Sequence, residues 1–227
     1  WSSEMVTTSM VLTSPIQVHT SSSNQPYLVY RDSVNKNIEI ATKSSSNWNF
    51  DSLLSNNEIS STHFSSVMLS NNTLVVAALV DDTTTTNLTV WDWTESSLIS
   101  STLVELQDNN VIIKSGVTSN QTVYISTLTS GGALSIHYRH PNEVNWSTVS
   151  IPQPPTSSTG YSLDMSTTNH LDLSVRTTDQ VHIYSMDEEQ NWTQTSHSLS
   201  ASSTGVWDFV VTPSHYVMLT TSSNNFL

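Results

Sequence analysis

Short apolar stretches separated by polar clusters run along the whole chain. Apolar residues alternate with polar ones or form short runs bounded by Ser, Thr, Asn and Pro, as in IQVH, YLVY, IEIA, TVYIS, LDLSV, VHIYS and YVMLT. β-Branched residues dominate these runs, which is typical of strands. The pattern predicts an all-β protein with no helix longer than two turns, and only DSLLSNNEI briefly imitates a helix.

The predicted strands recur with a period of about 47 residues. One set begins at Tyr27, Leu74, Val123, Leu171 and Tyr216, which lie 47, 49, 48 and 45 residues apart. A second set follows after a short polar link and begins at Ile38, Leu88, Leu134 and Val181. A further strand precedes each member of the first set, in IQVHT, FSSVML, IIKSGV, YSLDMS and WDFVVT.

Four short strands in each unit of about 47 residues are typical of a β-propeller blade. Stacked blades bury faces that a single sheet would leave exposed, and they leave only short edges. The sequence therefore predicts one β-propeller domain over residues 1–227, with about five blades of four short antiparallel strands. The predicted units are 15–62, 63–110, 111–159, 160–205, and 206–227 together with 1–14. The alternative is a β-sandwich, which predicts no such period.

The pair Asn-Trp recurs where the chain turns from the third strand into the fourth. The tryptophans expected at this repeated position are Trp1, Trp48, Trp146 and Trp192. Leu98 or Ile99 takes the position in the second unit. Because side chains alternate across a strand, we expect each Trp to face the neighbouring blade and each preceding Asn to face water. A buried Trp would be a packing residue, whereas an exposed one would offer a flat surface to a sugar.

The two ends of the chain together supply most of one further unit. We predict that Trp1–Val6 pairs as an outer strand beside the fifth unit, whose second strand is expected at Tyr216–Thr221. Alternatively, a second copy of the chain completes that blade, in a contact that can propagate into a filament. Since the sequence opens on Trp1, we expect it to be a processed or excerpted part of a longer protein.

Composition narrows the range of partners. Six Lys and Arg stand against 19 Asp and Glu, which gives a formal charge of -13. A phosphate backbone requires clustered basic residues, and those of this chain are scattered singly, so nucleic acid is not an expected partner. The apolar runs are too short for membrane insertion. The chain has no Cys, so it has no disulfide framework and no thiolate nucleophile.

Five sequons for N-linked glycosylation are present. They are centred on Asn71, Asn87, Asn120, Asn145 and Asn191. With 19 Asn and with 74 of the 227 residues Ser or Thr, about six sequons are expected by chance, so their number shows no enrichment. All five fall in or beside predicted turns, where a glycan could project into solvent. We therefore expect an extracellular or cell-surface protein, with Asn145 and Asn191 facing outward.

Candidate catalytic and metal-binding groups do not form a recognisable motif. The predicted first strands carry only Asp164 and Asp208, whereas a glycosidase needs paired carboxylates. Asp32, Asp81, Asp82 and Asp179 recur after second strands, where turn chemistry explains them and a calcium site is the alternative. His137 and His140 are expected on opposite faces of one strand, which is unsuited to a shared metal ion. We predict no catalytic residue, no metal site and no cofactor.

In outline, the repeated unit h-x-x-x-Y-x-D … I-x-I-A … N-W resembles that of sialidase-like and lectin β-propellers. The resemblance covers nearly the whole chain and depends on the period and on the position of Trp. Asp-boxes and the Trp-Asp endings of WD40 repeats are absent. A sialidase would also need three converging Arg, and the chain has only Arg31, Arg139 and Arg176. The resemblance therefore implies the architecture and no functional residue.

Three functions are compatible with this sequence. The first is a non-catalytic extracellular interaction scaffold that binds carbohydrate or acts in adhesion, with glycans or other copies of itself as partners. The second is a structural repeating subunit of a glycosylated extracellular fibre or surface layer. The third is a sialidase-like enzyme that processes glycans. Because fold alone does not determine function, the site must distinguish them.

Overall fold

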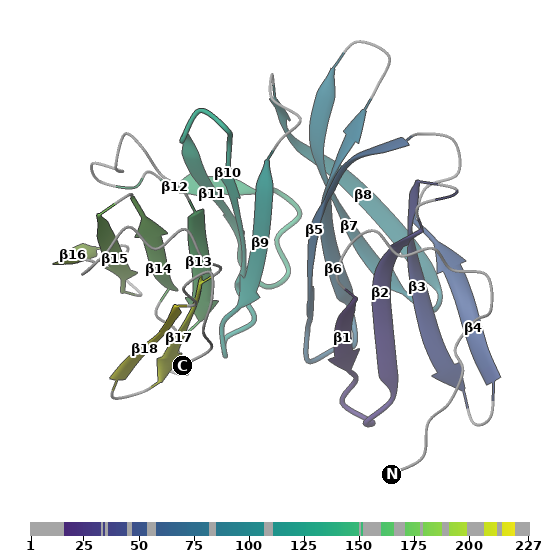
Figure 1. The fold of residues 1–227 in the computed structure, drawn as a ribbon. Helices are drawn as coiled ribbons and strands as arrows, with labels where there is room; N and C mark the ends of the chain where they lie inside the picture. Colours follow the sequence, from purple (N-terminus) through teal and green to yellow (C-terminus); the bar gives the residue numbers. More distant parts are fainter. Residues whose placement is uncertain are drawn as a thin grey trace. The chain divides into compact units, whose positions relative to one another are not determined.

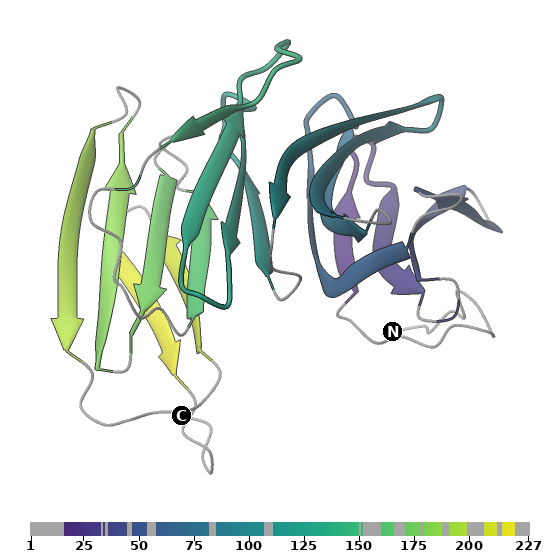
Figure 2. The ribbon, with the colours of Figure 1, turned by 90° about the horizontal axis from the view of Figure 1, so that it is seen from above.

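The structure is a computed structural model, and every element it describes is a β-strand (Figure 1). It describes residues 16–32, 34, 36–44, 47–53, 58–81, 85–106, 111–149, 151, 160–165, 171–177, 179–187, 191–198, 207–212 and 215–220, with the backbone alone at 58–62, 160–165, 207–212 and 215–220. The described strands form four four-stranded sheets and one two-stranded sheet (Figure 2). The prediction of an all-β chain is confirmed.

The first of two compact units, residues 1–110, contains two of the four-stranded sheets. Blade 1 consists of β1 (Gln17–Thr20), β2 (Pro26–Asp32), β3 (Asn37–Ser44) and β4 (Asn47–Ser52). Blade 2 consists of β5 (Glu58–Met68), β6 (Leu74–Asp81), β7 (Thr86–Thr94) and β8 (Ser97–Leu106). Each strand pairs with the next one along the chain and is antiparallel to it. β5 begins inside the predicted first unit.

The second compact unit, residues 111–227, contains the other two four-stranded sheets and a hairpin. Blade 3 consists of β9 (Ile112–Val117), β10 (Val123–Leu128), β11 (Leu134–Arg139) and β12 (Ser147–Val149). Blade 4 consists of β13 (Gly160–Met165), β14 (Leu171–Arg176), β15 (Gln180–Met186) and β16 (Trp192–Ser198). The hairpin pairs β17 (Trp207–Thr212) with β18 (His215–Thr220). In sequence, it corresponds to the first two strands of the predicted fifth unit.

Burial differs strongly between inner and outer strands of a blade. Every residue of β10 and β14 is buried, and so is every residue of β6 except Asp81. Such strands have both faces covered, which explains the apolar run of β6. In β14, polar side chains alternate with apolar ones and are buried with them. By contrast, β4 and β16 are exposed along nearly their whole length, apart from a half-buried Trp in each.

The turn between the first and second strands has the same conformation in blades 1, 2 and 3. In each, the first residue's N–H donates to the carbonyl of the fifth, and the fourth residue's N–H donates to the carbonyl of the first, at 2.9–3.0 Å. The three turns are Ser21–Gln25, Leu69–Thr73 and Thr118–Thr122. Their fourth residues have a left-handed backbone, at φ 61°, 65° and 68° for Asn24, Asn72 and Gln121. The starts at 21, 69 and 118 reproduce the period of the sequence.

Blades 1 and 2 are joined through their first strands by one amide side chain. Gln17 Nε2 donates to the carbonyl of Phe64 at 3.0 Å, and Gln17 Oε1 accepts from the backbone N–H of Ser66 at 2.7 Å. This side chain of β1 thus bonds to β5 much as a neighbouring strand would. His19 Nε2 lies 2.7 Å from Ser66 Oγ and adds a second link.

Each unit also has its own apolar core. In the first unit, one buried cluster includes Ile38 and Ile40 of blade 1 together with Val76 and Trp91 of blade 2. In the second unit, a cluster from blades 3 and 4 includes Ile136 and Tyr184. Burial of such side chains against a neighbouring sheet stabilises each by about 1.5–3 kcal/mol.

Several predictions concern the chain's ends and its extent. Trp1–Val6 lies outside the described residues, so its pairing stays a prediction. The assignment of residues 1–227 to one domain also stays a prediction. The boundary between the two compact units at Asn110 and Val111 falls where the predicted second repeat ends. Across the described ranges, no helix combines the length and hydropathy needed to cross a membrane.

Candidate functional site

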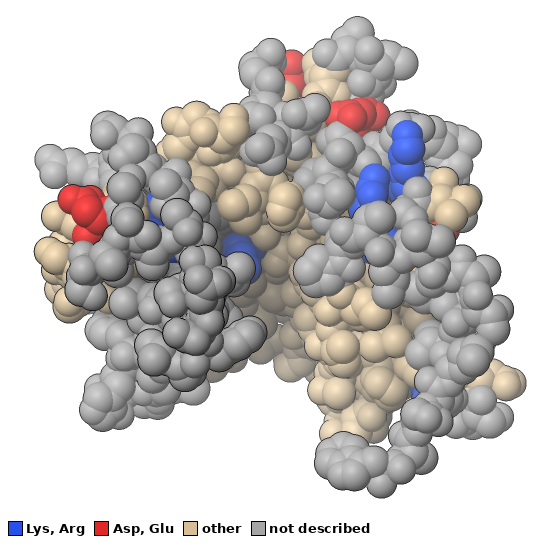
Figure 3. Space-filling model, viewed as in Figure 1, with Lys and Arg blue, Asp and Glu red and all other residues tan. Residues whose placement is uncertain are grey.

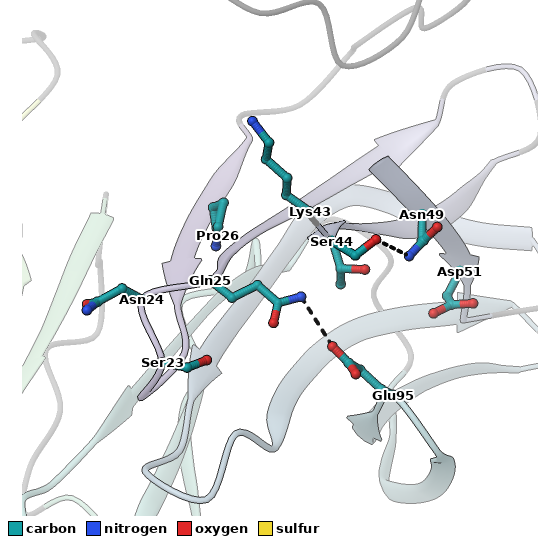
Figure 4. A pocket seen from close by; sticks show the side chains of 10 residues that line it. Ser23, Asn24, Gln25, Pro26, Lys43, Ser44, Asn49, Asp51 and Glu95 are labelled. Atoms are coloured by element: carbon teal, nitrogen blue, oxygen red, sulfur yellow. Dashed lines mark hydrogen bonds between the residues drawn. The ribbon is translucent and has the colours of Figure 1, made fainter. Parts of the chain in front are cut away.

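A pocket of about 680 Å³ lies in the first unit, between blades 1 and 2 (Figure 4). Its lining residues come from the β1–β2 turn, the end of β3, strand β4 and the β7–β8 turn. They are Ser23, Asn24, Gln25, Pro26, Thr42, Lys43, Ser44, Asn49, Asp51 and Glu95. Apart from Pro26, every one has a polar side chain, so the pocket presents hydroxyl, amide, ammonium and carboxylate groups.

Strand register explains why Thr42, Asn49 and Asp51 of blade 1 lie on the face that lines the pocket. Thr42 on β3 is directly opposite Asn49 on β4, and Ile40 is opposite Asp51. Residues that face each other across a ladder, or lie two apart on one strand, share a face of the sheet. Ile40 is buried in the core shared with blade 2. The pocket therefore continues this apolar interface outward, where the residues become polar.

Glu95 is held by two donors from blade 1. Gln25 Nε2 and the hydroxyl of Tyr27 each donate to Glu95 Oε1 at 3.3 Å. Tyr27 is only 3% exposed, and its ring meets that of Trp93 edge to face at 5.9 Å between centroids. Burial, and then the nearby Glu95 carboxylate, raise the pKa of Tyr27, so its hydroxyl stays a donor. No described residue donates to Oε2 of Glu95, which leaves that oxygen available.

Lys43 lies at the border of the pocket. Its Nζ is 5.9 Å from the centroid of the Trp48 ring, which is opposite Lys43 in the β3–β4 ladder. The two side chains form a cation–π pair, a contact worth about 0.5–1 kcal/mol when exposed. In Figure 4 the Lys43 side chain extends away from Glu95.

The second unit has aromatic side chains in the corresponding region between blades 3 and 4. Tyr124 and Tyr138 stack at 5.9 Å, and His140 meets Tyr138 edge to face at 5.2 Å. Across the interface, Tyr184 and Trp192 meet edge to face at 6.3 Å. The Tyr and Trp side chains of these contacts belong to the cluster that includes Ile136 and Leu173. Aromatic rings therefore line the interface between blades 3 and 4, whereas amides and carboxylates line the pocket between blades 1 and 2.

The repeated tryptophans are half-buried. Trp48 and Trp192 lie at the beginnings of fourth strands, and Trp146 immediately precedes one. The Trp146 ring lies under the Arg139 guanidinium at 4.7 Å, as the Trp48 ring lies under Lys43. The indole N–H groups of Trp48 and Trp146 are buried and make no hydrogen bond to a described residue. Trp1 lies outside the described residues, and equivalence of the tryptophans upon superposition stays a prediction.

The five sequon asparagines occupy different environments. Asn71, Asn120, Asn145 and Asn191 are exposed, and Asn87 is half-buried within β7. Asn71 Oδ1 accepts from the Thr73 N–H, and Asn191 Nδ2 donates to Asp187 Oδ2 at 3.2 Å. Glycosylation at all five stays a prediction.

The turn aspartates bond within their own turns. Asp32 accepts from the Val34 N–H at 2.9 Å, Asp81 from the Thr86 hydroxyl at 2.7 Å, and Asp179 from the Thr177 hydroxyl at 3.2 Å. Asp82 lies outside the described residues. These bonds support turn chemistry as the role of the aspartates. Among the described residues, no group of three His, Asp or Glu is arranged to hold a metal ion.

Other candidates from the sequence stand apart from the pocket. His137 and His140 are near different hydroxyls, since their Nδ1 atoms lie 3.1 Å from Oγ1 of Thr148 and of Thr122. Burial lowers the pKa of His137. Arg31 and Arg176 are buried at the ends of second strands, whereas Arg139 covers Trp146. The side chains of Asp164 and Asp208 lie outside what the structure describes.

Sequence reasoning missed the residues that line the pocket. Gln25 and Glu95 are 70 residues apart and follow no motif. The only signal was positional, since both lie in turns at corresponding ends of neighbouring repeats. Charge also gives little guidance, because in Figure 3 the charged residues of the described surface form small separate groups.

Comparison with known proteins supplies the class of fold. No protein-family model and no curated protein matches the sequence. Among solved structures, the SapL1 lectin in complex with alpha methyl fucoside is similar with a TM-score of 0.54 and 10% identity, over 91% of this chain and 72% of that chain.

Two further structures are similar over much of the chain. A triple Arg-to-Ala mutant of AofleA from Arthrobotrys oligospora has a TM-score of 0.60 and 8% identity, over 85% of this chain and 59% of its own. The polysaccharide lyase Uly1 has a TM-score of 0.57 and 9% identity, over 93% of this chain and 55% of its own. The chain thus spans little more than half of these two proteins.

Together with the four four-stranded sheets, these similarities confirm a β-propeller fold and not a β-sandwich. The β-propeller architecture that the sequence resemblance implied is thus present. At such low identity, the comparisons establish the fold alone.

Proposed function

We propose that this protein is a non-catalytic β-propeller module that binds carbohydrate in the pocket of its first unit, outside the cell or at the cell surface. The observation that carries the proposal is the polar pocket itself, with Glu95 fixed by two donors from the neighbouring blade. A binding site needs a concave surface and a few polar groups held in place.

The chemistry of the lining suits a sugar. Hydroxyl groups of a sugar donate and accept hydrogen bonds, and the amides of Asn24, Gln25 and Asn49 can do both. Carboxylates accept only, so Asp51 and Glu95 are suited to pairs of donating hydroxyls. Tyr27 and Gln25 reduce the freedom of Glu95 before a ligand arrives, which lowers the entropic cost of binding.

The SapL1 structure gives independent support, because it is a lectin of similar fold in complex with alpha methyl fucoside. Placement outside the cell is supported by the exposed sequon asparagines and by an acidic surface with few Lys and Arg. Uncharged hydroxyls and amides make up much of that surface.

The test is to screen the purified chain against a panel of glycans and to measure the affinity of any ligand by calorimetry. We expect Glu95→Ala to weaken binding at least tenfold, by an effect of about 1.5–3 kcal/mol for hydrogen bonds to a charged group. Glu143→Ala is the matched control, since Glu143 is an exposed carboxylate on the β11–β12 turn of the other unit. No bound glycan, or equal loss in both variants, would contradict the proposal.

Catalysis needs a separate measurement, because the pocket does contain two carboxylates. Hydrolysis of a bound glycan would release new reducing ends, and a lyase reaction would create an unsaturated, ultraviolet-absorbing product. We expect neither after prolonged incubation. Either product, if lost in Glu95→Gln, would identify an enzyme and overturn the non-catalytic assignment.

A further inference from the structure

Charge is unevenly placed around the pocket of the first unit. Figure 4 shows Asp51 and Glu95 on one side of it, with the Lys43 side chain extending in another direction. Asp51 and Glu95 are both exposed, whereas Lys43 is half-buried. Both carboxylates are therefore accessible to a ligand that enters the pocket.

The available atom of Glu95 is well defined. Its Oε1 already accepts from Gln25 and Tyr27, each at 3.3 Å. These two donors come from the start of β2 and the turn before it, so they hold the carboxylate from one side. The remaining oxygen, Oε2, can accept from a ligand without breaking either bond.

The positive charge of Lys43 is partly engaged elsewhere. Its Nζ lies over the Trp48 ring at 5.9 Å, and Trp48 stands on the opposite face of β4 from Asn49. A cation held over an aromatic face is less available to a carboxylate in the pocket. The pocket consequently presents more negative than positive charge to a ligand.

We propose that the preferred ligand of this pocket is a sugar with a free primary amine, an amino sugar that is not N-acetylated. An ammonium group donates three hydrogen bonds and carries a positive charge, so it gains from both carboxylates. A hydroxyl at the same carbon gains the hydrogen bond alone, and an acetamide adds bulk and loses the charge. This inference rests on the proposed function and names the class of ligand.

The experiment compares three tetrasaccharides with the same β-1,4-linked glucose backbone. They are the fully deacetylated chitosan tetramer, the N-acetylated chitin tetramer and cellotetraose, which differ only at carbon 2. At low salt and mildly acidic pH, where the amine is charged, we expect the chitosan tetramer to bind about tenfold more tightly than the others. Two exposed ion pairs would account for a preference of that size. The preference should shrink as salt screens the charges.

Variants locate the preference in the pocket. Asp51→Asn and Glu95→Gln should each reduce the ratio between the chitosan tetramer and cellotetraose, and the double variant should bring it close to one. Lys43→Gln should increase the ratio, because it removes a competing cation. Glu143→Gln should leave it unchanged and controls for general attraction of a cationic sugar to an acidic chain. Circular dichroism would verify that each variant keeps its β structure.

Three results would overturn the inference. The first is equal or tighter binding of cellotetraose or the chitin tetramer. The second is a preference for the chitosan tetramer that survives in the double variant, which would place the cation elsewhere on the surface. The third is no binding of any of the three. If the glycan panel still yields a ligand whose affinity depends on Glu95, carbohydrate binding in the pocket is retained and only the preference for an amino sugar is wrong.

Discussion

The two interblade regions differ in what fills them. In the first unit, the outer part of the interface between blades 1 and 2 is a polar pocket containing Glu95 and Asp51. In the second unit, Tyr138 and Trp192 pack against the buried core of blades 3 and 4. The backbone pattern is the same in both, with four antiparallel strands in each blade. The same repeated fold thus accommodates an aromatic packing region in one unit and a polar pocket in the other, according to the side chains at the outer part of the interface.

The largest expected effect tests the stabilising role of the aromatic region. Tyr184 is fully buried and contacts Trp192. Tyr184→Ala should lower the free energy of unfolding by about 3–5 kcal/mol, because it leaves a cavity in the core. Urea unfolding followed by fluorescence measures the change. Tyr184→Phe, which keeps the ring, should cost much less. A loss below about 1 kcal/mol in Tyr184→Ala would show that the rings do not carry the stability of this region.

The next effect concerns the turns that repeat in both units. Asn72 has a left-handed backbone, and its Oδ1 accepts from the N–H and the hydroxyl of Ser22 in the other blade, at 2.8 and 3.0 Å. Asn72→Ala should cost about 1–2 kcal/mol, because it removes these bonds and leaves a residue poorly suited to that backbone.

In the second unit, Gln121 holds the equivalent left-handed position. Gln121→Asn should change stability in the opposite direction, since Asn adopts this conformation more readily than Gln. The same urea titration measures both variants. Stabilisation by Asn72→Ala would contradict the importance of the turn.

A third effect separates binding from stability. Tyr27→Phe removes the hydroxyl that donates to Glu95, and we expect affinity for a bound glycan to fall about threefold to tenfold through loss of one hydrogen bond. Tyr124 is the second residue of β10, as Tyr27 is of β2, so Tyr124→Phe is the matched control. Calorimetry should show unchanged affinity for Tyr124→Phe. Equal losses in the two variants would mean that the pocket does not contain the binding site.

The smallest expected effect is on the pH dependence of stability. Burial lowers the pKa of His19 in the first unit and of His137 in the second. The unfolded chain therefore takes up a proton more readily at these positions. Their contribution is fully present above the ordinary histidine pKa of about 6.5 and is lost as pH falls from there through the lowered folded pKa.

Urea midpoints measured between pH 7.5 and pH 5 would test this pH dependence. We expect His19→Gln and His137→Gln each to flatten the curve. Rising stability on acidification, reduced in these variants, would contradict the assigned direction.

Periodicity predicted the fold because every blade repeats the same burial. The runs beginning at Leu74, Val123 and Leu171 are buried second strands, and their spacing identified the propeller. Alternation likewise predicted an exposed Asn145 beside a more buried Trp146. Such signals are local, because each strand's own sequence reports how deeply it is covered.

The pocket could not be predicted in this way. Its donors and acceptors, such as Gln25 and Glu95, meet only after two blades pack together. Each alone is an ordinary polar turn residue, and nothing in a turn's composition says what the next blade places opposite it. The sequence pattern also did not predict where each strand begins and ends. For example, β5 begins at Glu58 and its pairing with β6 shifts in register between Ile59 and Phe64.

The exposed outer strands have a consequence for behaviour in concentrated solution. Most proteins keep such edges apart with charged residues, especially Lys. β16 carries only uncharged polar groups and a histidine after Trp192, in the run TQTSHS. Hydration of hydroxyls and amides does not depend on long-range repulsion, so dissolved ions do not screen it. The tendency of the blade 4 edge to self-associate should therefore change little between dilute buffer and brine.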